Sequence, residues 1–154
     1  MYVSNLGNYY ENFVVGSVIQ HSLSKTIFES DNNLFCLLTM NHHPLHTNID
    51  YSSKEKFTKP IVVGTLVFSL TVGITVPDIS GKAIANLMYE NINHLHPVFI
   101  NDTIYARTEI LEKRESKSIK NCGIIYVETT SYNQNNIDVL KFRRKVLIKK
   151  RNML

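Results

Sequence analysis

The segment from Ile61 to Val76 restricts most strongly how this chain of 154 residues can fold. It follows Lys59-Pro60, contains Gly64 near its start and ends before Pro77. Apolar side chains surround it on nearly every side, which predicts a buried helix and not one with a wide solvent-facing stripe. A helix of this kind needs a surrounding layer, which the rest of the chain must supply.

The chain after residue 82 changes to the alternation of strands. We place these strands near residues 83–93, 103–115, 122–133 and 138–149, with turns at 101–102 and 135–136. In the last strand, Arg143 and Arg144 point to opposite faces because side chains alternate along a strand. The pattern predicts an antiparallel sheet that curves around the helix, an α+β architecture.

The part of the chain before the buried helix is expected to be less regular. We expect a loosely tied start over residues 1–12 and a first strand over 13–21. Residues 26–40 should contain a short helix with Ser30 or Asp31 at its N-cap. A polar turn or short helix is expected over 50–57. These elements together form one domain over 1–154, with a core of about residues 10–150.

Composition excludes several classes of function. With 44% hydrophobic and 19% charged residues, the chain can bury a core. It has no apolar run of membrane-spanning length and no signal-type start, so we expect a cytoplasmic protein without membrane contact. The net charge of +4 comes mainly from the C-terminal strand, without aromatic platforms, so nucleic acid is not expected. Two distant cysteines and the pair His94 and His96 lack the spacing of a metal site.

Residues 41–48 form a Pro-stiffened loop that carries the candidate chemistry. His46 is our choice for an acid/base residue, because an imidazole both takes and gives protons near neutral pH. Gly64 follows in the first turn of the buried helix, where backbone N–H groups are free and the helix dipole is positive. The alternatives are a structural role for His46 and close helix packing for Gly64.

These residues carry a family resemblance. The segment Asn41-x-His43-Pro44-Leu45-His46 resembles the Asp-x-Asn-Pro-Leu-His signature of the MaoC-like (R)-specific enoyl-CoA hydratases. The segment 59–64 resembles the one that opens their central helix. Short motifs at 85–87, 96–103, 114–118 and 142–144 resemble the branch of mesaconyl-CoA and itaconyl-CoA hydratases, also called β-methylmalyl-CoA dehydratases.

The resemblance covers about residues 10–150 and implies both fold and activity. It implies a hot-dog fold, a homodimer or higher homo-oligomer, and a coenzyme A thioester as substrate with no other cofactor. The implied reaction is the reversible addition of water across the double bond of a 2-enoyl-CoA. In that reaction His46 would be the acid/base and the Gly64 N–H would hold the enolate oxygen.

The motif departs from the general pattern at two positions. The family's Asp matches Asn41, and its Asn matches His43. An amide cannot accept a proton at neutral pH, although it can orient a water. Either His46 performs both proton transfers with Asn41 positioning water, or His43 shares the work. The asparagine is either a feature of the mesaconyl/itaconyl branch or the mark of a binding-only homologue.

A mesaconyl-type substrate carries a second carboxylate, which an arginine fork can bind. Arg143, Arg144 and Arg114 are the candidates for this contact or for the phosphates of coenzyme A. Two other functions stay open. A hot-dog thioesterase would need a carboxylate near the helix start, where Glu55 is the nearby glutamate. The second alternative function is that of a non-catalytic acyl-CoA-binding protein.

Overall fold

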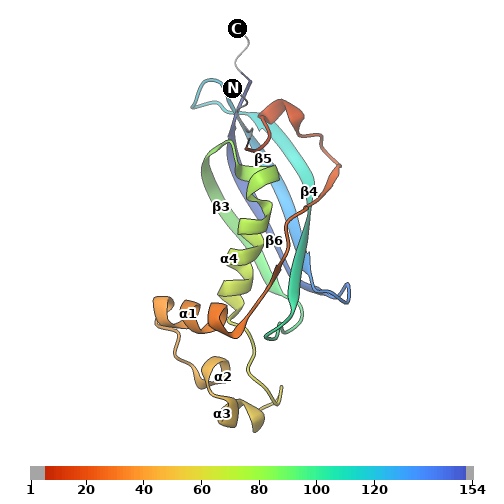
Figure 1. The fold of residues 1–154 in the computed structure, drawn as a ribbon. Helices are drawn as coiled ribbons and strands as arrows, with labels where there is room; N and C mark the ends of the chain where they lie inside the picture. The colour runs from red at the N-terminus through yellow and green to blue at the C-terminus, as the bar shows by residue number, and fades with distance from the viewer. Residues whose placement is uncertain (1–5, 152–154) are drawn as a thin grey trace, which may run out of the picture.

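In the computed structural model, which describes residues 6–151, a curved antiparallel sheet wraps one long helix (Figure 1). The strands follow the order β1-β4-β5-β6-β3, and β2 pairs with β4 outside this order. Their bounds are β1 Val18–Gln20, β2 Lys25–Thr26, β3 Ala83–His94, β4 Thr103–Glu115, β5 Cys122–Tyr132 and β6 Asp138–Lys149. The predicted α+β arrangement of the hot-dog fold is confirmed.

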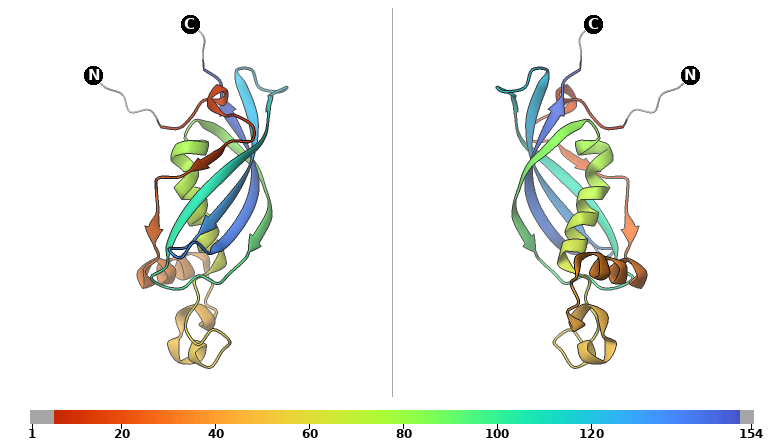
Figure 2. Two further views of the ribbon diagram at one scale, coloured as in Figure 1. Left: turned by 90° about the vertical axis from the view of Figure 1, so that its right-hand side faces the viewer. Right: turned by 90° about the vertical axis from the view of Figure 1, so that its left-hand side faces the viewer.

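The helices separate into one central helix and a group at its N-terminal end. The central helix α4 spans Gly64–Thr75 and continues into a π-helical turn, η2, over Val76–Ser80. The others are η1 Tyr10–Asn12, α1 Glu29–Thr39, α2 Pro44–Thr47 and α3 Ile49–Ser53. Figure 2 shows α2 and α3 projecting beyond the end of the sheet, next to the start of α4.

The core lies between α4 and the concave face of the sheet. Val67 and Ile74 of α4 pack against a cluster that includes Leu140 and Phe142 of β6. Strand alternation explains this packing, since every second residue of β6 points inward. Thr65 of α4 stays exposed on the side that the sheet leaves open. Among residues 6–151, no helix has the length and hydropathy to cross a membrane.

The four long strands agree with their predicted ranges to within one residue, but the start of the buried helix does not. We expected a helix from Ile61, whereas α4 begins at Gly64. Residues 61–63 are held in an extended form by contacts distant in sequence. The Ile61 N–H donates to the Leu45 carbonyl, and the Val62 N–H donates to the Val98 carbonyl at 2.8 Å. The end was also misplaced, because the chain continues past residue 76 as η2.

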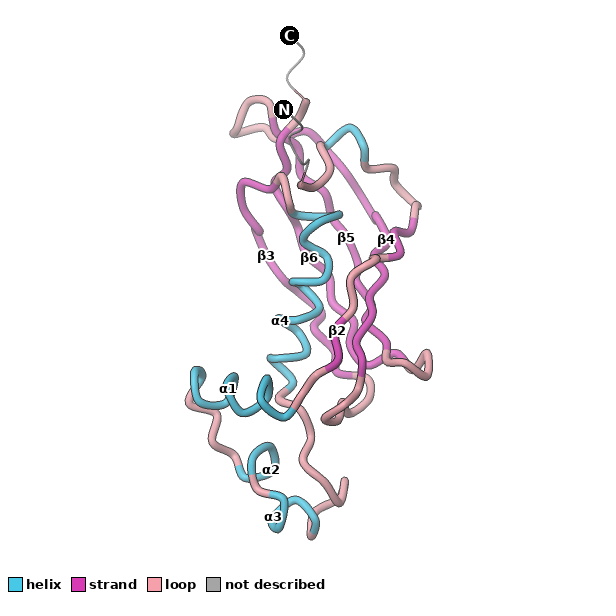
Figure 3. Tube along the Cα trace, in the orientation of Figure 1, coloured by secondary structure: helices cyan, strands magenta, loops and turns pink. Residues whose placement is uncertain are grey.

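The N-terminal third contains further corrections (Figure 3). The strand predicted over 13–21 is only the three residues of β1, because Gly16 takes a left-handed φ of 82° in a turn before it. The predicted loose start holds η1, in which Tyr10 is buried; residues 1–5 lie outside the described part. The N-cap of α1 is Phe28, and the Asp31 carboxylate accepts from the Phe28 N–H at 2.9 Å.

Candidate active site

A cavity of about 310 Å³ lies at the N-terminal end of α4. Its polar groups come from the imidazoles of His46, His94 and His96 and from Gly64. Apolar side chains form the rest of the wall: Phe57, Ile61, Val62, Val67, Leu95, Pro97 and Val98. The sequence predicted His46 and Gly64 as partners, and the structure brings both to this cavity.

The ring of His46 is oriented by a backbone carbonyl. Its Nδ1 lies 2.9 Å from the carbonyl oxygen of Ile61. A carbonyl oxygen only accepts, so Nδ1 carries the proton and Nε2 keeps a lone pair. Nε2 has no hydrogen-bond partner within residues 6–151. The nitrogen that can act as a base is therefore unoccupied.

The short helix α2 holds His46 in this position. His43 is its N-cap, and the His43 Nδ1 accepts from the Leu45 N–H at 3.1 Å. Pro44 is the first residue, where a missing N–H costs no hydrogen bond. The lone pair on the His43 Nδ1 is therefore engaged in capping. The rings of His43 and His46 meet edge to face, with centroids 6.1 Å apart.

A buried asparagine joins the His46 segment to the start of α4. Asn32 of α1 is 1% exposed. Its Nδ2 donates to the His46 carbonyl at 3.0 Å, and its Oδ1 accepts from the Val63 N–H at 3.0 Å. Because Val63 directly precedes Gly64, one side chain holds the two halves of the site. Sequence reasoning missed Asn32, and only its place among the apolar residues of α1 could have drawn attention to it.

Gly64 is the first residue of α4. Its N–H has no acceptor within residues 6–151, as expected for the first turn of a helix, where such groups also carry the positive end of the dipole. A Cβ added at Gly64 would lie 2.9 Å from Cε1 and 3.0 Å from Nε2 of His94. The absence of a side chain therefore lets the His94 ring approach the helix N-terminus.

His94, at the end of β3, and His96, two residues later, were not predicted to belong to the site. His94 is the last residue of β3 and makes no hydrogen bond through its ring within residues 6–151. The Nδ1 of His96 lies 2.8 Å from the Asp138 carbonyl, which assigns the proton to that nitrogen. Both rings reach the cavity because β3 is an edge strand and its end lies beside the start of α4.

The remaining predicted residues lie elsewhere. Asn41 follows α1, where its N–H donates to the Cys36 carbonyl, and neither it nor His43 lines the cavity. The Arg114 guanidinium is exposed and donates to the Glu115 carbonyl at 3.3 Å.

The two adjacent arginines of β6 point to opposite faces of the sheet, as predicted, and neither lines the cavity. Arg143 lies 2.7 Å from Glu128, whose carboxylate raises the pKa of Arg143. Arg144 is fully buried, and burial lowers its pKa. It donates to Thr75 at 2.6 Å, at the opposite end of α4 from Gly64.

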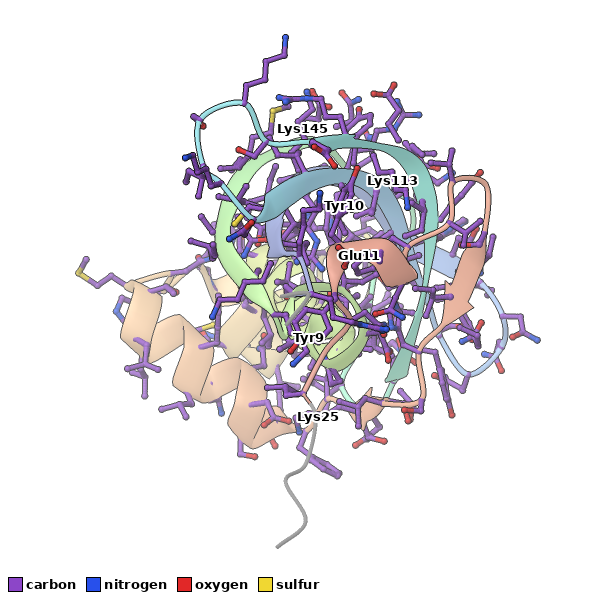
Figure 4. All side chains as sticks on the ribbon, turned by 90° about the horizontal axis from the view of Figure 1, so that it is seen from above. Tyr9, Tyr10, Glu11, Lys25, Lys113 and Lys145 are labelled. Atoms are coloured by element: carbon purple, nitrogen blue, oxygen red, sulfur yellow. The ribbon has the colours of Figure 1, made fainter. Side chains whose placement is uncertain are left out.

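A larger cavity of about 890 Å³ has a different character. It lies among residues of η1 and of the ends of β4 and β6, around Tyr10 (Figure 4). Its basic side chains already have partners: the Lys113 Nζ donates to the Phe13 carbonyl, and Lys150 pairs with Glu115. We therefore take the smaller cavity as the candidate active site.

Comparison with known proteins identifies the family of the chain. The family model of the MaoC-like domain matches residues 12–133. The chain is 32% identical over 148 residues to β-methylmalyl-CoA dehydratase of Chloroflexus aurantiacus and 30% identical over 148 residues to mesaconyl-CoA hydratase of Cereibacter sphaeroides. A solved structure of a MaoC domain protein from Chloroflexus aurantiacus superposes with a TM-score of 0.92 at 31% identity.

These matches cover most of this chain and less than half of the other proteins. The two curated relatives align with 96% of this chain, which spans 42% and 43% of their lengths. The alignment with the solved structure covers 99% of this chain and 43% of the chain in that structure.

Proposed function

Because the chain belongs to the MaoC-like domain family, we propose that it catalyses the reversible hydration of a 2-enoyl-CoA thioester. The observation that carries this proposal is the hydrogen bond from the His46 Nδ1 to the Ile61 carbonyl. It leaves Nε2 as a free base in a cavity that also contains the start of α4. A base and an oxyanion donor meet two of the three requirements of this reaction, and the third is a proton donor to C2.

The attack of water and the stabilisation of the enolate follow from these two groups. Nε2 of His46 takes a proton from water while the water oxygen forms a bond to C3 of the thioester. The electron pair of the C2–C3 double bond moves toward the carbonyl, and the resulting enolate oxygen accepts a hydrogen bond from the Gly64 N–H. A general acid then gives a proton to C2, which completes the 3-hydroxyacyl thioester, and exchange with solvent removes the proton from His46 and returns one to the acid. Dehydration follows the same path in reverse.

The substrate is proposed to be short, with a branched or carboxylated acyl group. The apolar wall of the 310 Å³ cavity suits a short acyl chain. The names of the curated relatives support a carboxylated group. The cavity is not lined by Arg114, Arg143 or Arg144. We therefore do not propose that these arginines bind the substrate carboxylate in the cavity of their own chain.

The chain is proposed to work as a homodimer. Two exposed apolar surfaces suit such an interface. One is the outer face of α1, with Leu34, Leu37 and Leu38, and the other is on the edge strand β3, with Ile84 and Leu87.

The test compares mesaconyl-CoA, itaconyl-CoA and crotonyl-CoA in one spectrophotometric assay. Hydration removes the conjugated thioester absorbance and releases no thiol, which a thiol reagent reports in parallel. Loss of absorbance without thiol supports the proposal, and preference for the two carboxylated substrates supports the narrower substrate class. Thiol release would instead identify a thioesterase. Binding of the thioesters with neither signal would identify a non-catalytic acyl-CoA-binding protein.

A further inference from the structure

We propose that His94 is a second acid/base residue, which exchanges the proton at C2 of the substrate while His46 handles water at C3. This inference rests on the proposed hydration of a 2-enoyl thioester. It places a second proton carrier at the end of β3, in a chain where Asn41 stands in the place of the aspartate of the hydratase signature.

The position of His94 is the first argument. A Cβ placed on Gly64 would lie 2.9 Å from Cε1 and 3.0 Å from Nε2 of its ring. The ring therefore lies beside the N–H proposed to hold the carbonyl oxygen. C2 of an acyl thioester is bonded directly to that carbonyl carbon. A group that delivers a proton to C2 must lie next to the oxyanion site, as His94 does.

The shortage of other proton carriers is the second argument. The titratable side chains that line the cavity are His46, His94 and His96. The first and last of these each have Nδ1 engaged with a backbone carbonyl, at 2.9 and 2.8 Å. His94 has both ring nitrogens without a partner within residues 6–151. It is also exposed, so solvent can restore its proton after each turnover.

With two imidazoles, the number of protons taken up equals the number given. Neutral His46 removes one proton from water, and the hydroxide oxygen forms the C3–O bond. The π electrons form the enolate, and protonated His94 gives its proton to C2 to form the C2–H bond. The product gains one water, His46 is left protonated and His94 neutral, and exchange with solvent returns both to their starting states.

The experiment isolates the step at C2. Butyryl-CoA has no double bond and no leaving hydroxyl, so incubation in D2O reports only exchange of its C2 hydrogens, followed by mass spectrometry or proton NMR. We expect the wild-type protein to exchange these C2 hydrogens at a measurable rate. We expect the exchange rate of His94→Gln to be at least about 100-fold lower, because that is the usual contribution of a general acid/base. His42→Gln removes an exposed imidazole outside the cavity and should exchange like the wild type.

Two further measurements separate chemistry from structure. Added imidazole should restore exchange to His94→Ala, because the site is open to solvent, and a purely structural defect would not respond. The dissociation constant of butyryl-CoA should be the same for wild type and His94→Gln. Wild-type exchange rates in His94→Gln would overturn the inference, as would loss of exchange in His96→Gln alone.

The outcomes also distinguish this inference from the proposed function. Wild type that hydrates an enoyl thioester, with His94→Gln exchanging normally, would overturn only the role of His94. Exchange that depends on His94 in a protein that hydrates none of the three thioesters would support the role of His94 and refute hydration. A wild type that neither hydrates nor exchanges would overturn both.

Discussion

Replacing Asn32 by alanine should damage stability and activity together. The substitution leaves the His46 carbonyl and the Val63 N–H without the two 3.0 Å hydrogen bonds that Asn32 supplies. A buried polar group left unpaired costs about 1–3 kcal/mol. The Val63 N–H is buried and the hydrogen bond to the His46 carbonyl is partly buried, so we expect the free energy of unfolding to fall by about 2–4 kcal/mol. The total free energy of unfolding of a native protein is only about 5–15 kcal/mol, so this loss should be easily measured.

The same substitution should slow hydration, because it releases the His46 segment from the start of α4. A misplacement of about 1 Å can cost roughly 100-fold in rate, and we expect Asn32→Ala to lose at least about tenfold under conditions where it is folded. Urea unfolding and the absorbance assay measure the two effects. The matched control is Asn33→Ala, which truncates the exposed neighbour. A free energy of unfolding within about 0.5 kcal/mol of that control would refute the structural role of Asn32.

Three further predictions test other parts of the structure. Gly64→Ala should reduce hydration at least about tenfold with a change in unfolding free energy below about 1 kcal/mol, since the new Cβ meets the exposed His94 ring, which can move aside. Arg144→Met should leave the free energy of unfolding unchanged or raise it by about 1–2 kcal/mol in urea titrations, because this buried guanidinium has no carboxylate partner within residues 6–151. Burial lowers the pKa of His21, although the hydrogen bond and charge of Asp78 oppose this. The unfolded chain then binds the proton first, so stability should fall as pH drops below about 6.5, and His21→Gln should weaken that dependence in urea titrations at several pH values.

The sheet could be predicted closely because its signal is local. Alternation within 103–115 and 138–149 determines which side chains face α4, and those bounds agree with the structure. Turn residues helped as well: Asn101 and Asn136 take left-handed φ values of 73° and 58° where turns were expected. The start of α4 could not be predicted in this way. Residues 61–63 are apolar enough for a helix but are held extended by partners far away in sequence.

The candidate site was predictable only where a motif marks it. His46 and Gly64 stand in recognisable segments, whereas Asn32 and His94 gain their roles from residues that are 14 to 31 positions away in the chain. Alternation correctly separated Arg143 from Arg144. It could not show that one pairs with Glu128 while the other is buried against Thr75.

The central claim is that His46 acts as the base in the cavity at the start of α4. The most direct measurement is the rate of absorbance loss for the preferred thioester, compared among wild type, His46→Gln and the exposed-loop control His42→Gln. We predict that His46→Gln loses at least about 100-fold in kcat, equivalent to about 2.7 kcal/mol, while the control stays within about twofold. Turnover by His46→Gln at the wild-type rate would contradict the account.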